Sequence, residues 1–167
     1  MKQLTFEDQV VVITGAGNGI GRAYAHEFAR RGARVVVNDL GGTVGGEGSD
    51  ANAADAVVKE ITAANGNAIA NYDSVVDGER VVAAALSKWG RVDVLINNAG
   101  IAYGTAFGDM TAALWRKMLD VHVDGSYACT RAVWPAMVEQ GFGRLMFTSS
   151  PFGLHAERMF SHYSTAK

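Results

Sequence analysis

The chain has 167 residues, of which 49% are hydrophobic and 19% are charged, and this balance is typical of one packed globular domain. Its 15 lysine and arginine residues and 17 aspartate and glutamate residues leave a net charge of −2, which argues against non-specific binding to nucleic acid or to membranes. The single cysteine, Cys129, excludes an internal disulfide and a cysteine-rich zinc site, so we predict no metal centre.

No signal-peptide core and no apolar run of the ~18 residues that a membrane span needs are visible. We therefore expect a protein of the cytoplasm without a membrane segment.

The first patterned stretch covers residues 10–23. Its β-branched run at 10–13 predicts a strand buried on both faces, and a glycine turn and a helix that ends at Gly32 follow. Strand, glycine turn and helix place backbone N–H groups and a positive helix end against a phosphate. A glycine-rich turn that binds nothing is the alternative. The predicted cofactor contacts of this turn are Gly15, Asn18, Gly19, Ile20 and Gly21.

A second strand at residues 34–38 completes a right-handed, parallel βαβ unit and is followed by Asp39. A carboxylate at this position hydrogen-bonds the ribose hydroxyls of an adenine dinucleotide and repels a 2′-phosphate. Asp39 therefore favours NAD over NADP, and a solvated turn aspartate is the alternative. The glycine-rich stretch 40–50 is interpreted as a flexible surface loop inside the domain.

Helices and strands alternate through the rest of the chain. Apolar spacing and capping residues predict helices at 51–65, at 78–89 after an N-capping Asp77, and from Thr111 to about 140 with a kink at Pro135. Strands are predicted at 68–72, 92–96 and 144–148. Five strands alternating with helices indicate an α/β fold with a doubly wound parallel sheet, in a single domain over residues 1–167.

Ligands of such a sheet bind beyond the carboxyl ends of its strands, where several further polar or small residues fall. Asp73 is positioned to accept a hydrogen bond from an adenine amino group, although a turn aspartate paired with Ser74 is the alternative. The stretch 97–100 offers small residues for a ribose to lie against. These positions add Asp73, Ser74, Asn98, Ala99 and Gly100 to the predicted cofactor site.

Tyr163 and Lys167 are spaced to share one face of a helix. An ammonium group beside a phenol stabilises the phenolate form, which can take a proton from a substrate hydroxyl. A hydroxyl such as that of Ser150 can hold the substrate oxygen meanwhile. Taken alone, the tyrosine–lysine pair is also compatible with a surface pair of no function.

Together, residues 14–21, residues 97–100, Ser150 and the Tyr163/Lys167 pair resemble the short-chain dehydrogenase/reductase family, over essentially the whole chain and in the family's own order. The resemblance implies a Rossmann fold and an oxidoreductase that moves a hydride between NAD and a secondary alcohol or ketone. It implies Tyr163 as general acid/base, Lys167 as its support and a ligand of the nicotinamide ribose, and Ser150 as the group that orients the substrate. A small-molecule substrate and a homodimer or homotetramer are also implied.

One position departs from the common family pattern. The family's asparagine on the long helix is replaced by His122, within the stretch 121–125. The resemblance implies that the backbone carbonyl at this position holds a relay water, so His122 is counted as a catalytic candidate. A helix histidine without a catalytic role is the alternative.

Four stretches, 37–42, 71–75, 121–122 and 130–134, resemble the dehydrogenase part of the multifunctional hydratase–dehydrogenases of peroxisomal β-oxidation and their bacterial relatives. This similarity implies a (3R)-3-hydroxyacyl-CoA substrate and is compatible with a peroxisomal location. Between Ser150 and Tyr163 the chain departs from that branch, because His155, Glu157, Arg158 and Met159 replace small, glycine-rich residues.

Compared with the family pattern, the chain is expected to be a fragment. The helix that carries Tyr163 is expected to be cut off at Lys167, and the strands after the fifth are expected to be missing. The sequence therefore predicts weak or no turnover from these residues alone. A dinucleotide-binding module without catalysis, or an inactive fragment, is the alternative to an NAD-dependent dehydrogenase.

Overall fold

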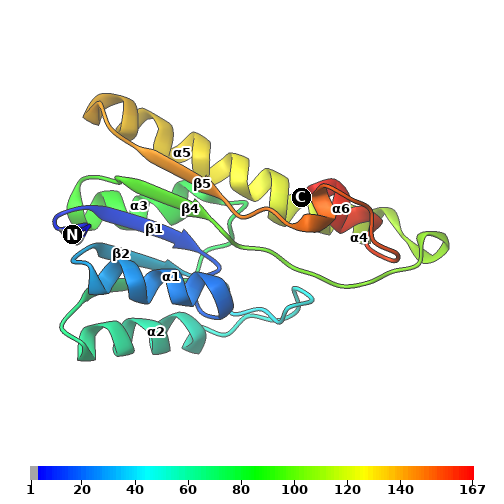
Figure 1. Ribbon diagram of the computed structural model, residues 1–167, viewed down its shortest axis with the longest axis horizontal. Coiled ribbons are helices and arrows are strands. Elements are labelled where there is room, and N and C mark those ends of the chain that lie inside the picture. Colours follow the sequence, from blue (N-terminus) through cyan, green and yellow to red (C-terminus); the bar gives the residue numbers. More distant parts are fainter. Residues whose placement is uncertain (1–3) are drawn as a thin grey trace.

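The computed structural model of the chain describes residues 4–167. Its strands form one parallel sheet in the order β3-β2-β1-β4-β5, so the predicted doubly wound α/β fold is confirmed (Figure 1). The strands are β1 (Val10–Thr14), β2 (Arg34–Asn38), β3 (Asn67–Asn71), β4 (Val94–Asn97) and β5 (Arg144–Phe147). The α-helices are α1 (Gly19–Arg30), α2 (Asn52–Ala63), α3 (Gly78–Trp89), α4 (Ala112–Leu119), α5 (Gly125–Gln140) and α6 (Ser161–Ala166).

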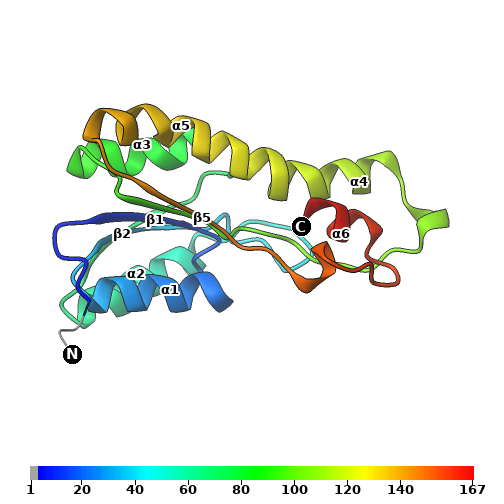
Figure 2. The same cartoon turned by 45° about the horizontal axis from the view of Figure 1, so that its top comes forward.

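Helices cover both faces of the sheet, α1 and α2 on one side and α3 and α5 on the other (Figure 2). Along β1, Val11 and Ile13 belong to the hydrophobic cluster under α1 and α2, whereas Val10 and Val12 belong to the cluster under α3 and α5. Since neighbouring side chains of a strand point to opposite faces, a strand covered on both sides needs an uninterrupted apolar run. This is the physical reason for the β-branched sequence of β1.

Several predicted boundaries shift by one or two residues. The fourth strand begins at Val94 instead of 92, because the buried carboxylate of Asp93 accepts a hydrogen bond from the Val10 backbone N–H at 2.8 Å. The helix α2 ends before Asn65, which has φ +60°, and the Gly66 N–H donates to the Ile61 carbonyl at 2.9 Å. Asn65 therefore makes the left-handed turn that ends this helix, a position that glycine commonly occupies.

Two predictions about helix geometry are corrected. The long predicted helix changes geometry at a π-helical turn, Asp120–Asp124, between α4 and α5, whereas Pro135 lies inside α5. A π-turn inserts an extra residue into the helix and changes which backbone groups pair. Asp77 precedes α3 as predicted, but its side chain makes no capping bond and instead pairs with Arg80 at 3.1 Å.

The predicted surface loop 40–50 folds back over the carboxyl end of the sheet. The Ala102 N–H donates to the Val44 carbonyl at 2.9 Å, and Lys117 Nζ donates to the Gly45 carbonyl at 3.1 Å. These bonds attach the loop to the segment after β4 and to α4, so the loop becomes one wall of a cavity.

Candidate active site

A cavity of about 690 Å³ opens where the carboxyl ends of the strands meet the first turn of α1. Of the residues predicted to bind cofactor or to act in catalysis, the lining includes Gly15, Asn18, Gly19, Ile20, Asp39, Asp73, Ser74, Asn98, Ala99, Gly100, His122, Tyr163 and Lys167. Gly21 and Ser150 were predicted as well but do not line it. The fold thus brings together residues from most of the length of the chain.

The glycine turn has the shape of an anion cradle. Gly15 has φ +63°, and a Cβ on Gly21 would lie 2.2 Å from the Gly15 carbonyl oxygen, so Gly21 serves close packing of the turn instead of lining the cavity. At Gly19, with φ +53°, a Cβ would meet nothing within 4 Å. Asn18 makes no side-chain cap and the first turn of α1 holds no acidic residue, so these side chains leave the first N–H groups of the helix available to a ligand. The phosphates of a dinucleotide fit this helix end.

Asp39 is held in place by backbone donors. Its two carboxylate oxygens accept hydrogen bonds from the N–H groups of Gly17 and Gly41, each at 2.7 Å. A Cβ on Gly17 would lie 2.8 Å from Asp39 Oδ2. The middle glycine of the turn is therefore required by the carboxylate, a reason that the motif spacing alone does not reveal. Each oxygen keeps a lone pair for a ligand hydroxyl.

Asn98 ties two strand ends together. Its side-chain amide donates to the carbonyls of Thr14 and Gly15 at 2.9 and 3.1 Å, and its backbone N–H donates to Thr14 Oγ1 at 3.0 Å. The Ala99 N–H reaches the same hydroxyl at 3.0 Å. Asn98 thus fixes the position of the glycine turn, in addition to lining the cavity.

Tyr163, Lys167 and His122 form a compact group at one end of the cavity. Lys167 Nζ lies 5.8 Å from the centroid of the Tyr163 ring and donates to the Thr148 carbonyl at 2.8 Å. The rings of His122 and Tyr163 meet edge to face at 5.4 Å between centroids. Burial lowers the pKa of Lys167 from its ordinary value.

The imidazole of His122 is buried and neutral. Its Nε2 lies 3.1 Å from the Ile101 backbone nitrogen and 2.8 Å from the Ile101 oxygen, so its tautomer decides which of the two it pairs with. Burial, as the main cause, lowers its pKa to about 4. The His122 carbonyl accepts from Ser126 Oγ at 2.7 Å. A Cβ on Gly100 would lie 2.5 Å from His122 Cε1, so residue 100 must be small.

Ser150 stands at the start of a short 3₁₀ turn, Pro151–Gly153, and its Oγ accepts from the Phe152 N–H at 3.3 Å. Two residues of this region approach Tyr163 and Lys167 closely. A Cβ on Gly153 would lie 2.5 Å from the backbone carbon of Lys167. The Phe152 ring lies 6.1 Å from the Tyr163 ring, centroid to centroid.

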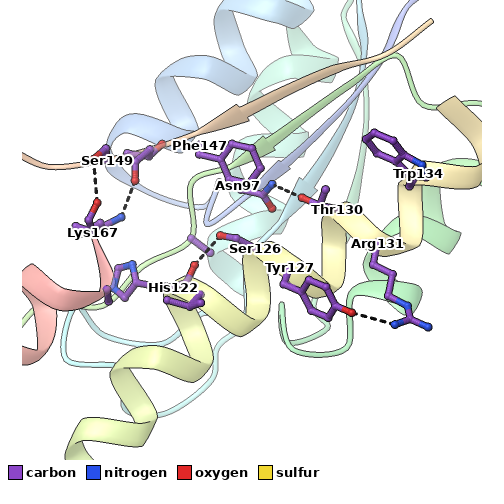
Figure 3. A pocket seen from close by; sticks show the side chains of 14 residues that line it. Asn97, His122, Ser126, Tyr127, Thr130, Arg131, Trp134, Phe147, Ser149 and Lys167 are labelled. Carbon is purple, nitrogen blue, oxygen red and sulfur yellow. Dashed lines mark hydrogen bonds between the residues drawn. The ribbon is translucent and has the colours of Figure 1, made fainter. Parts of the chain in front are cut away.

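An apolar groove of about 520 Å³ adjoins the cavity between α5 and β5 (Figure 3). Exposed Tyr127 and Trp134 of α5 and Phe147 of β5 line it. Figure 3 shows Lys167 and His122 at one end of this groove, so the two hollows share residues.

Sequence reasoning missed Asn38 and Lys117, which line the cavity, and Asn71, which lies next to Asn38 outside the lining. Asn38 and Asn71 are buried at the ends of β2 and β3, and Lys117 holds the loop 40–50. An asparagine at the carboxyl end of a strand is the signal that points to the two asparagines, because a buried amide needs partners. Lys117 carries no such signal, since its partner is a distant backbone carbonyl.

Within residues 4–167, no group of three or more histidine, cysteine or acidic side chains is placed to hold a metal ion. The same part of the chain contains no helix with the length and apolar character needed to cross a bilayer.

The fold and this site define a dinucleotide-binding oxidoreductase domain. The family model for short chain dehydrogenases matches residues 9–167, and the chain belongs to this family. A short chain dehydrogenase from Mycobacterium avium has a similar structure, with a TM-score of 0.86 and 39% identity over 98% of this chain and 59% of that one.

Two multifunctional proteins are also similar. Peroxisomal multifunctional enzyme A of Dictyostelium discoideum is 53% identical over 98% of this chain and 37% of its own length. The full-length peroxisomal multifunctional enzyme type 2 of Drosophila melanogaster matches with a TM-score of 0.81 and 40% identity, over 98% of this chain and 26% of its own. The chain therefore spans well under half the length of these two relatives.

Proposed function

We propose that this chain is the catalytic and cofactor-binding part of an NAD-dependent dehydrogenase that acts on a (3R)-3-hydroxyacyl-CoA. The observation that carries the proposal is the meeting of Tyr163, Lys167 and His122 at one end of the cavity that also contains the glycine turn. A module that only bound a dinucleotide would not need this group of residues beside the cofactor.

The preference for NAD rests on Asp39. Its carboxylate faces the cavity where the second strand ends, which is the position that contacts the adenosine ribose in this fold. A 2′-phosphate at ~4 Å would be repelled by about 1 kcal/mol in water and about 4 kcal/mol at the effective dielectric of a protein surface. The lysines that line the cavity within residues 4–167 are Lys117 and Lys167, and each donates to a backbone carbonyl.

In the proposed reaction the bound nicotinamide accepts or donates the hydride. Tyr163 takes the proton from the substrate hydroxyl, Ser150 holds the same oxygen, and the Lys167 ammonium stabilises the phenolate. The Lys167 side chain is partly buried and bonded to the Thr148 carbonyl, which restricts it to one orientation beside the phenol. The His122 carbonyl, which accepts from Ser126 Oγ, is the proposed holder of a relay water, while its imidazole pairs with Ile101.

The acyl-CoA substrate is proposed from the resemblance of four stretches of the sequence to the hydratase–dehydrogenases of β-oxidation, and from the aromatic surroundings of Tyr163. The rings of Phe152 and Phe160 both lie 6.1 Å from the Tyr163 ring, centroid to centroid. An apolar wall beside the reacting group suits an acyl chain better than a sugar. His155, Glu157 and Arg158 are exposed on the same segment and are available to polar parts of a substrate.

The test is turnover of (3R)-3-hydroxybutyryl-CoA with NAD or NADP, followed by the absorbance of the reduced cofactor. Tyr163→Phe should still bind NAD and lose about 100-fold or more in turnover, because proton transfer in the transition state contributes this much. Tyr24→Phe, on α1 and away from the cavity, is the matched control. Measurable turnover by the wild type that Tyr163→Phe retains in full would overturn the acid/base role.

Asp39→Asn tests the cofactor preference separately, since it removes the charge and keeps the size. The preference for NAD over NADP should narrow by about tenfold, as removal of a repulsion of this size predicts. Faster reduction of NADP than of NAD by the wild type would show that Asp39 has been assigned wrongly.

A further inference from the structure

We infer that Asn38 and Asn71 are positioning residues that aim the Asp73 carboxylate at the adenine of the cofactor. Neither side chain has been assigned a role above. The inference rests on the proposed dinucleotide site and adds to it the pair of residues that sets adenine recognition.

The two asparagines lie side by side on adjacent strands. They are register partners at the carboxyl ends of β2 and β3, and their exposed fractions are 1% and 8%. Asn38 Nδ2 donates to Asn71 Oδ1 at 2.7 Å, and Asn71 Nδ2 donates to Asp73 Oδ2 at 2.7 Å. The amides therefore form a directed chain that ends on a carboxylate.

Asn38 also holds the backbone of the same turn. Its Nδ2 donates to the Asp73 carbonyl oxygen at 2.8 Å, while the Asp73 N–H donates to Asn71 Oδ1 at 3.3 Å. Both the main chain and the side chain of Asp73 are thereby fixed. A carboxylate held by amide donors has further lone pairs for a donor in the cavity.

The backbone of these two asparagines reaches the other parts of the cofactor site. The Asn38 carbonyl accepts from the Ala16 N–H of the glycine turn at 2.9 Å, and the Asn71 carbonyl accepts from the Asp39 N–H at 3.0 Å. One cross-strand pair therefore joins the phosphate cradle, the ribose carboxylate and Asp73. A buried amide pair that only closed the sheet would not need to bond the cavity-lining carboxylate.

The ligand group that this arrangement selects is an N–H donor. Asp73 lines the cavity, and its Oδ1 forms an ion pair at 3.6 Å with Arg80, whose side chain is largely exposed. The exocyclic amine of adenine is such a donor, whereas hypoxanthine carries a carbonyl oxygen at the same ring position. A carboxylate aimed at this position should therefore prefer adenine to hypoxanthine.

The experiment compares binding of NAD and of nicotinamide hypoxanthine dinucleotide by titration calorimetry. The wild type should prefer NAD by about tenfold or more, as expected for a hydrogen bond to a charged group. Asn71→Leu, which is close in shape and has no donor, should bring this ratio close to one. Asn67→Leu makes the same change at the exposed, opposite end of β3 and should keep the wild-type ratio.

Thermal unfolding of each variant shows whether it is folded, and Asn71→Ser replaces the leucine variant if that one is not. An unchanged ratio in a folded Asn71 variant, or no discrimination by the wild type, overturns the positioning role while leaving dinucleotide binding intact. Failure of the wild type to bind either dinucleotide overturns the proposed cofactor site and this inference with it.

Discussion

At the scale of single residues, the site depends on polar side chains that are buried and oriented by the backbone. Asp39 accepts two backbone N–H groups, and His122 pairs with Ile101. Leaving such groups unpaired in the interior costs about 1–3 kcal/mol each, so their partners are as necessary as the groups themselves. Burial also lowers the pKa of His122, which makes the stability of the fold depend on pH.

His122 should make the fold less stable in mild acid. Its pKa in the fold is lowered to about 4, below the usual 6.5, so the unfolded chain binds the proton more readily. The contribution of His122 to the free energy of unfolding is fully present above the unfolded pKa and is lost as the pH falls towards the folded pKa. At about pH 5 the loss of stability is about 2 kcal/mol. Burial lowers the pKa of His162 too, with the same sign.

Urea unfolding of the wild type and of His122→Asn across this pH range measures the effect. The variant should lose less stability in acid than the wild type, and His155→Asn, at an exposed position, should behave like the wild type. Identical pH dependence in His122→Asn and the wild type would show that this imidazole is not buried in its neutral form.

At the scale of elements, the turn between β1 and α1 works because its glycines pack backbone against backbone. Gly21→Ala places a Cβ 2.2 Å from the Gly15 carbonyl, which the turn can relieve only by moving. We expect dinucleotide affinity to fall by at least about tenfold and stability to fall by about 1–3 kcal/mol. Gly108→Ala is the control, because its Cβ would meet nothing within 4 Å. Titration with NAD and urea unfolding measure both effects, and unaltered affinity in Gly21→Ala would contradict the close-packed turn.

The loop 40–50 is a second element whose role depends on a contact. Lys117→Ala removes the bond to the Gly45 carbonyl and leaves the loop attached through Val44 and Ala102. Cleavage by thermolysin before the exposed Val44 should become several times faster, since proteases cut segments that open locally. Lys59→Ala, on the exposed face of α2, serves for comparison. Equal cleavage rates in the two variants would mean that Lys117 does not hold the loop.

At the scale of the whole molecule, one sheet carries two apolar layers, and its central strands are buried on both faces. Leu95 of β4 is fully buried under α3 and α5. Leu95→Ala should lower the free energy of unfolding by about 2–5 kcal/mol through lost burial and a cavity. Leu154→Ala, at a leucine that is 92% exposed, should change it by less than about 0.5 kcal/mol. Urea unfolding of the two variants measures both free energies. Similar losses of stability in Leu95→Ala and Leu154→Ala would contradict a shared core.

The sequence predicted the elements well where their patterns are local. The β-branched runs and glycine stops place β1, β2, α1 and α3 within a residue or two. Prediction was wrong where another contact decided the geometry, whether that contact is local, as for Asp77, or long-range, as for His122. The Asp77 side chain pairs with Arg80 instead of capping α3, and the long helix changes at Asp120–Asp124, beside the His122 contact with Ile101.

The amino-acid sequence by itself determined the alternation of strands and helices, the fold class and the set of polar residues that follow the strands. These properties depend on side-chain periodicity and on the glycine positions, which are local. Only the tertiary structure decided the strand order, the return of the loop 40–50 over the cavity, and the bonding of Asn38 to Asn71 and Asp73. Each of these is a contact between residues far apart in the chain, and such contacts arise only when the two apolar faces of the sheet are covered at once.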